Sequence, residues 1–288
     1  MLELMTQIGL QSLETIWIAF SSMFWPACFF FLLALILKQG KLLSDIQKAA
    51  KETSLNLQLI LFNAVIVAPI IAFSLEGFEF FFRHQQYAIL TRDHWMNLPI
   101  PIIIFFTIFI GDFVGYWRHR LEHTIPLWPS HAVHHSDTQM TWLTLERFHP
   151  INRLTTFLID TGILLFLGIP PFAIIINNMV RHYYGYFIHA DLPWTYGNIL
   201  GKIFVSPTMH RWHHSADPKY FQCNFATIFA IFDWAFGTYK LPGPCNSPLG
   251  IADKIPTRLS NQILYAFKPS SYSKLIRYRF KKLQSPKF

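Results

Sequence analysis

The 288-residue sequence predicts an all-α integral membrane protein, formed as one domain (1–288) with a histidine-rich core at about 111–240 and a basic C-terminal tail at about 241–288. Composition is the first reason, because only 14% of the residues are charged, against about 25% in soluble proteins, and 52% are hydrophobic. Long apolar stretches are the second reason. The third is the position of the histidines, since eleven of the 13 lie between positions 119 and 214.

Three apolar stretches are long enough to cross a bilayer, which takes about 20 helical residues. They cover about 16–37, 55–75 and 98–117. The lysine-bearing linker at 38–54 should be cytoplasmic by the positive-inside rule, which places 76–97 outside and the end of the third helix back at the cytoplasm. We therefore expect about three transmembrane helices, in the bacterial inner membrane or the endoplasmic reticulum.

A fourth apolar stretch at 157–180 differs from the others, because GIPP at Gly168–Pro171 breaks a helix. Histidine clusters lie on both sides of this stretch. They can meet only if its two ends emerge on the same side of the membrane. A re-entrant helical hairpin with GIPP at its tip satisfies this condition. The segments 118–150 and 181–240 should then form a cytoplasmic helical cap.

The histidines of this cap repeat one spacing. HAVHHSD at 131–137 and HRWHHSAD at 210–217 both place histidines at i, i+3 and i+4, and HRLEH at 119–123 adds a pair at i and i+4. Helical residues three or four apart share one face, with Cβ atoms about 5–6 Å apart, so two such imidazoles can reach one metal ion. The eight histidines are His119, His123, His131, His134, His135, His210, His213 and His214.

The adjacent histidine in each repeated phrase points in another direction. His134 beside His135, and His213 beside His214, differ by about 100° around a helix of 3.6 residues per turn. Such a neighbour can serve a second metal. We therefore interpret the two phrases as the halves of one site for two metals, with positions left open for substrate or oxygen.

Other histidine chemistries fit less well. Imidazole suits zinc, copper, iron and nickel, but a zinc protease needs glutamate directly after the first histidine, where HRLEH has Arg120. Haem needs one or two axial histidines rather than eight. Two metals with open positions beside a lipid phase favour iron and dioxygen acting on an aliphatic C–H bond. The isolated histidines His84, His94 and His182 are expected to be hydrogen-bonded structural residues.

The basic residues do not indicate a nucleic-acid partner, although the formal net charge is +8. They form short blocks beside apolar runs, around Lys38–Lys51 and Arg277–Lys282. Blocks of this kind suit anionic lipid headgroups.

Residues 111–240 resemble the fatty acid hydroxylase superfamily of membrane di-iron enzymes, most closely a sterol desaturase-like branch. GDFVGYWRHRLEH at 111–123 is similar to the first histidine box of this family, and LWPSHAVHHSD at 127–137 is similar to the second. Further phrases follow in the family's order: LERFHP at 145–150, YFIHAD at 186–191, SPTMHRWHHS at 206–215 and FDWAFGTY at 232–239.

The resemblance implies a histidine cage that holds two iron ions, with dioxygen as co-substrate. Such enzymes hydroxylate or desaturate a membrane lipid of the sterol or fatty acyl type, with electrons from cytochrome b5 or ferredoxin and its reductase. The implied ligands are the eight histidines above together with His189. His149 is interpreted as a ligand or as a support for one, and Asp137 and Asp233 as residues that orient ligand imidazoles or cap helices.

Two alternative functions are left open. FIHAD and HRWHH also resemble alkylglycerol monooxygenase, so an ether-lipid oxygenase is the second enzymatic hypothesis. A non-catalytic membrane protein that binds metal is the third. Two departures from the usual phrases of the branch, Asp191 and FQCNFATI at 221–228, are expected to influence substrate specificity.

Overall fold

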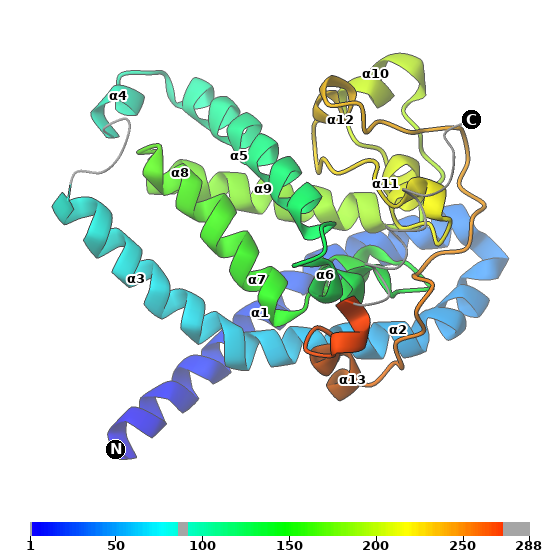
Figure 1. Cartoon of the computed structure of the whole chain (residues 1–288), viewed down its shortest axis with the longest axis horizontal. Coiled ribbons are helices and arrows are strands. Elements are labelled where there is room, and N and C mark those ends of the chain that lie inside the picture. The colour runs from blue at the N-terminus through cyan, green and yellow to red at the C-terminus, as the bar shows by residue number, and fades with distance from the viewer. Residues whose placement is uncertain (1, 86–91, 273–288) are drawn as a thin grey trace.

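The computed structural model describes residues 2–85 and 92–272. Regular secondary structure in these residues is helical, and the only β pairing among them is two isolated bridges, Phe204 with Phe229 and Ser215 with Leu249. The side chain of His84 and the tail beyond residue 272 lie outside the described residues. Figure 1 shows long helices on one side of the molecule and short helices gathered around the ends of α5 and α9.

The first part of the chain makes two long helices that run back along each other. α1 (Leu2–Lys38) ends in a 3-10 turn at Gln39–Lys41, and α2 (Leu42–Phe62) continues through a π-helical turn at Asn63–Val67 into α3 (Ala68–Gln85). Large apolar side chains on these helices face outward, including Trp25 (76% exposed) and Phe73 (79% exposed). Many exposed apolar side chains on the same helices fit contact with lipid.

Two stretches of the described chain are long and apolar enough to cross a membrane, judged by length and composition. One is the helical path Leu13–Leu75, which contains the first two expected spans, and the other is Ile100–Glu122, which covers most of the third. The number of spans stays a prediction.

Helix α5 (Ile100–Glu122) lies at the centre of the fold, after the short helix α4 (Arg92–Met96). α5 and α9 approach closely where Gly111 and Gly115 face the side chains of Asn177 and Arg181, because a Cβ atom at either glycine would overlap them. The last turn of α5 carries His119, and His123 caps its C-terminus. The central helix therefore delivers the first histidine pair to one end of the molecule.

The GIPP stretch forms a helical hairpin. Its first arm is α7 (Pro150–Thr156), a π turn (Phe157–Thr161) and α8 (Gly162–Phe166), and its second arm is α9 (Pro171–His189). Gly168 takes a left-handed φ of 70° in the turn, a conformation that costs glycine little. Figure 1 shows both arms running from the tip to the histidine end. The hairpin is present, and its re-entrant placement in a membrane stays a prediction.

Short elements complete the histidine end of the molecule. A buried ion pair between Arg147 and Glu52, with a nitrogen–oxygen distance of 2.7 Å, ties them to α2. The helices are α6 (Trp128–His135), α10 (Gly197–Ile203), α11 (Pro207–His213), α12 (Ile231–Ala235) and α13 (Leu259–Tyr265), with 3-10 turns at Trp142–Glu146 and Pro218–Tyr220.

Candidate metal centre

Nine histidines, eight of them buried and His119 half-buried, lie together where the ends of α5, α6, α9 and α11 meet. They form two groups, and within each group one ring nitrogen per histidine lies within 4.8 Å of all the others. The five-histidine group consists of His119, His123, His131, His135 and His213; the four-histidine group consists of His134, His189, His210 and His214.

The two repeated phrases are divided between the groups in a reciprocal way. The i and i+4 members of the first phrase, His131 and His135, belong to the five-histidine group, while His134 belongs to the other. In the second phrase the i and i+4 members belong to the four-histidine group, and His213 crosses to the five-histidine group. Each phrase therefore contributes to both groups, as the 100° offset between adjacent helical residues predicts.

Three imidazoles of the five-histidine group are held by one stretch of backbone. The carbonyl oxygens of Phe221, Cys223 and Phe225 accept hydrogen bonds from Nδ1 of His123 (2.9 Å), His213 (2.6 Å) and His119 (2.8 Å), respectively. The three carbonyls belong to alternate residues of an irregular segment, in which Asn224 takes a left-handed φ of 58°. Because a carbonyl only accepts, each of these rings carries its proton on Nδ1, which leaves Nε2 with a free lone pair.

The free lone pairs face one another at short range. Nε2 of His213 lies 3.0 Å from Nε2 of His119, and neither nitrogen has a proton to share when both rings are neutral. Adjacent ligands of an octahedral ion are about 3.0 Å apart when the metal–nitrogen bonds are about 2.1 Å long. A cation between the rings turns this repulsion into ligation, so the residues fit a metal ion.

The four-histidine group has the same Nε2 spacing, with 3.0 Å between His210 and His189 and 3.1 Å between His189 and His134. Its outer surroundings differ. Only His189 has a backbone partner for Nδ1, the carbonyl oxygen of Gly185 at 2.7 Å. Nδ1 of His134, His210 and His214 is buried and has no hydrogen-bond partner among the described residues. This group fits a metal, but its rings are less firmly oriented.

Burial keeps these histidines neutral, which is the form that binds a metal. It lowers the pKa of His213 in one group and of His189 in the other to about 4, mainly through loss of solvation. The pKa of His123 and of His210 is lowered further, by burial and by neighbouring histidines. At neutral pH the cage presents uncharged imidazoles.

Neutral ligands bring no negative charge to balance a dication. Buried carboxylates around the histidines supply negative charge instead. Glu122 and Asp160 both pair with Arg118, at 2.7 and 2.8 Å, and Asp160 and Asp112 both pair with Arg181, at 2.8 and 3.6 Å. Three carboxylates thus face two guanidinium groups. Glu122 Oε2 also lies 3.4 Å from Nδ1 of His131, so one of these carboxylates is directly behind a histidine of the five-histidine group.

A family model for fatty acid hydroxylases matches residues 104–238, the segment that contains all nine clustered histidines. The segment 104–238 belongs to the fatty acid hydroxylase family. The predicted resemblance to the fatty acid hydroxylase superfamily is thereby confirmed, and the sterol desaturase-like branch stays a prediction.

Known relatives of this fatty acid hydroxylase segment are 28–30% identical to the chain over the aligned residues. The chain is 28% identical over 193 residues to an ornithine lipid hydroxylase of Rhizobium tropici, covering 66% of this chain and 57% of that protein. It is 30% identical over 149 residues to an alkylglycerol monooxygenase of Danio rerio (51% and 33%) and 29% identical over 192 residues to a very-long-chain aldehyde decarbonylase of Oryza sativa (64% and 68%). The alignments therefore span little more than half of the first relative and a third of the second. No solved structure gives a significant match.

Within the fatty acid hydroxylase segment, the three residues considered as supports have distinct positions. Nδ1 of His149 accepts a hydrogen bond from the Ile151 amide, which caps α7, and its Nε2 lies 2.9 Å from the Ile263 carbonyl oxygen. Asp233 accepts hydrogen bonds from the amides of Phe225 and Ala226, at 2.8 and 3.0 Å. It thus fixes the backbone whose carbonyl orients His119 rather than contacting an imidazole.

Asp137 and the isolated histidines lie outside both groups. Asp137 accepts hydrogen bonds from Thr144 at 2.8 Å and from the Gln139 amide at 2.9 Å, in the loop after α6. His182 lies 3.2 Å from Glu146, and His94 is on exposed α4. Asp191, a departure from the usual family phrase, forms ion pairs with Lys38 (2.6 Å) and Arg211 (2.8 Å).

Sequence reasoning did not find two features of this site. The first is the carbonyl row of Phe221–Phe225, which lies in the unusual phrase FQCNFATI and acts through backbone atoms that carry no side-chain signal. The second is Glu122, which is part of the HRLEH motif itself. It sits three residues after His119, and its role depends on α6 bringing His131 to its side.

Proposed function

We propose that this protein is a membrane oxidoreductase that hydroxylates or desaturates an aliphatic carbon of a membrane lipid, using dioxygen and two iron ions held by the nine histidines. The observation that carries the proposal is the pair of facing, proton-free Nε2 atoms of His119 and His213 at 3.0 Å, within two adjoining histidine groups. The family membership of residues 104–238 and the lipid hydroxylase among the relatives support the reaction class.

The roles of the residues follow from their positions. The nine imidazoles would hold the metals, the carbonyls of Phe221–Phe225 set ring orientation, and Glu122 supplies negative charge behind His131. Iron ions bound there would supply dioxygen activation and hydrogen abstraction from the lipid. Burial excludes bulk water from the cage, since every clustered histidine apart from His119 is at most 4% exposed.

The sterol or fatty acyl type of substrate and the cytoplasmic position of the histidine end are parts of the same proposal. So are three membrane spans with a re-entrant hairpin, location in the bacterial inner membrane or endoplasmic reticulum, and electron supply by cytochrome b5 or ferredoxin. Two apolar helical stretches and the lipid-modifying relatives support membrane association.

The test uses the full chain expressed in a membrane, purified and analysed for metal. We expect two irons per chain, and a lipid change of one added oxygen or two lost hydrogens in expressing cells. His134→Ala and His213→Ala remove one ligand from each group, so both should lose iron and lipid oxidation. His94→Ala changes an exposed histidine on α4 and should change neither. Intact iron content and oxidation in both ligand variants would refute the proposal.

An ether-lipid oxygenase is the second candidate, because alkylglycerol monooxygenases of several animals are about 30% identical to this segment. Turnover of an alkylglycerol that requires a reduced pterin would decide for it, and strict dependence on ferredoxin or cytochrome b5 would decide against it. A metal-binding protein without catalysis would contain the metals and leave the lipids of aerobic cells unchanged.

A further inference from the structure

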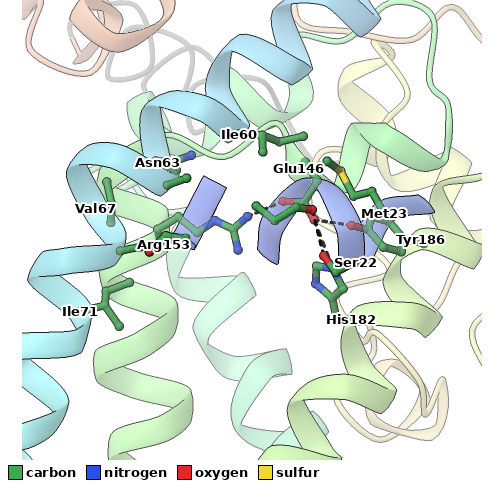
Figure 2. Close-up of a pocket in the computed structure, with 14 residues that line it drawn as sticks. Ser22, Met23, Ile60, Asn63, Val67, Ile71, Glu146, Arg153, His182 and Tyr186 are labelled. Atoms are coloured by element: carbon green, nitrogen blue, oxygen red, sulfur yellow. Dashed lines mark hydrogen bonds and ion pairs between the residues drawn. The ribbon is translucent and has the colours of Figure 1, made fainter. Parts of the chain in front are cut away.

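A pocket of about 240 Å³ lies between α1, the α2–α3 helix and the polar end of the hairpin. Figure 2 shows Met23 of α1, and Ile60 and Val67 of the α2–α3 helix, on its walls, and Glu146 at its centre. Most of its wall residues are apolar, among them Ala19, Met23, Ile60, Ala68 and Ile71, and α1 adds the hydroxyl groups of Thr15 and Ser22. An apolar pocket with a few convergent polar groups has the composition of a ligand site.

The polar end of the pocket is electrically balanced. Glu146 pairs with Arg153, accepts a hydrogen bond from the Tyr186 hydroxyl at 2.8 Å, and lies 3.2 Å from Nε2 of His182. Burial lowers the pKa of His182, so that ring is neutral. One carboxylate therefore meets one guanidinium, and the pocket offers no uncompensated charge to a ligand. A neutral polar group fits better than a free anion or cation.

Asn63 provides an unused acceptor in this pocket. Its Nδ2 donates to the carbonyl oxygen of Phe148 at 2.9 Å, while its Oδ1 is buried and has no partner among the described residues. A buried acceptor without a partner costs free energy that a donor can recover. Asn63 also begins the π turn Asn63–Val67, and π turns within α-helices occur frequently at functional sites.

The pocket adjoins the four-histidine group through one aromatic ring. Phe148 stacks on the imidazole of His134, with centroids 5.5 Å apart, and the Arg153 guanidinium lies 4.9 Å from the centroid of the same ring. Tyr186 is one helical turn before His189 on α9, so it lies on the same face. The Arg153 guanidinium and the Phe148 ring therefore lie between a ligand in the pocket and this group.

We propose that this pocket binds the lipid substrate, and that Asn63 Oδ1 accepts a hydrogen bond from a hydroxyl or amide N–H next to its aliphatic chain. The substrate class is thus a neutral amphiphile with a hydrogen-bond donor. Its aliphatic chain would meet the metal centre on the side of the four-histidine group. This inference rests on the proposed function and adds the polar chemistry that the lipid must carry.

Photolabelling of the full-length protein in phosphatidylcholine nanodiscs tests it. The probes are 1-hexadecanol with a diazirine in mid-chain and the matched methyl ether, which cannot donate. Labelled positions are mapped by mass spectrometry and normalised to label on the lipid-facing surface around Trp25 and Phe73, which corrects for partitioning. We expect the alcohol to label the pocket roughly two- to tenfold more than the ether, the range of one net hydrogen bond.

Two pocket-filling variants and one matched control locate the binding. Ala68→Phe fills the pocket from the α2–α3 helix and Ala19→Phe fills it from α1, so either should remove pocket labelling. Ala72→Phe makes the same change at an exposed position one turn further along α3 and should preserve it. A fill variant that does not fold, judged by gel filtration, is replaced by the other.

Each contrary outcome has a specific meaning. Equal labelling by alcohol and ether would overturn donor recognition by Asn63, and pocket labelling that survives both fill variants would overturn binding in this pocket. The labelling needs no turnover. Absent lipid oxidation with the expected labelling would therefore refute the proposed function alone, whereas oxidation without pocket labelling would refute this inference alone.

Discussion

The two histidine groups share one Nε2 spacing but differ in what stands behind the rings. In the five-histidine group, three rings donate Nδ1–H to the carbonyls of Phe221–Phe225, and His131 faces Glu122. In the four-histidine group only His189 has a backbone partner, and the other three rings have buried Nδ1 atoms without partners among the described residues. Most rings of the first group are therefore oriented by their surroundings, and the second group depends more on the metal.

This difference suggests a division of labour. Outer partners that orient a ligating histidine fix its tautomer and raise its basicity, so the five-histidine site should hold its metal tightly. The four-histidine site has one ligand fewer and adjoins the apolar pocket through Phe148. We therefore expect the lipid to react beside the four-histidine site.

Removing one histidine ligand at a time, from one group or the other, should have the largest effect on lipid oxidation. It should also give the clearest contrast in iron affinity between the two groups. His210→Ala leaves three imidazoles at its site, whereas His123→Ala leaves four, of which His119 and His213 are oriented by backbone carbonyls. Both variants should lose lipid oxidation by at least about 100-fold, since outer-partner changes alone cost 10–100-fold. Iron titration should show weaker binding in His210→Ala than in His123→Ala. Equal affinities would remove the contrast between the groups.

Acid should destabilise the metal-free protein, with an effect smaller than ligand removal. Folding lowers the pKa of His189 and His213 from about 6.5 to about 4. Their contribution to stability is thus complete above about pH 6.5 and is lost as the pH falls toward 4. Each such histidine costs about 1.4 kcal/mol per pH unit in that window.

The melting temperature of the metal-free protein between pH 8 and 5 measures this effect. Burial raises the pKa of Asp233 to about 6, so protonation of this residue stabilises the folded protein as the pH falls. This single group opposes the loss of stability that several histidines cause. The melting temperature should fall from about pH 6.5 downward, and less so in the His189→Gln, His213→Gln double variant. A constant or rising melting temperature would contradict neutral burial of both groups.

Glu122→Gln should have the smallest effect on iron binding, and the effect should be confined to the five-histidine group. The amide keeps the shape of Glu122 but removes the negative charge 3.4 Å from His131 Nδ1. Iron affinity at the five-histidine site should fall by about 10-fold, the lower end for an outer partner, while the other site keeps its iron. Asp253→Asn, next to Tyr265, is the matched control. Equal loss from both sites would mean that Glu122 does not act through His131.

The sequence predicted the parts of this site that depend on local periodicity. The i, i+3, i+4 spacing correctly indicated that His134 and His135 serve different groups, and GIPP correctly marked a helical hairpin that brings His189 beside α6. Both follow from helix geometry and proline chemistry, which act within a few residues. The family resemblance was equally readable, because the boxes keep their order.

The remaining features depend on contacts between distant segments. Nothing in FQCNFATI reveals that alternate carbonyls meet three imidazoles from α5 and α11, because backbone atoms are the same in every residue. Glu122 and Asn63 are ordinary polar residues until α6 and Phe148 are placed beside them. His149 could be interpreted as a ligand until its two ring nitrogens were found bonded to the backbone around α7 and α13.

The central claim is that two unlike metal sites share the repeated histidine phrases. The Mössbauer spectrum of the full-length protein loaded with ⁵⁷Fe tests it most directly. We predict two irons per chain in two quadrupole doublets of equal area, with Glu122→Gln altering only one of them. One iron per chain, or a single doublet that shifts as a whole in Glu122→Gln, would contradict the claim.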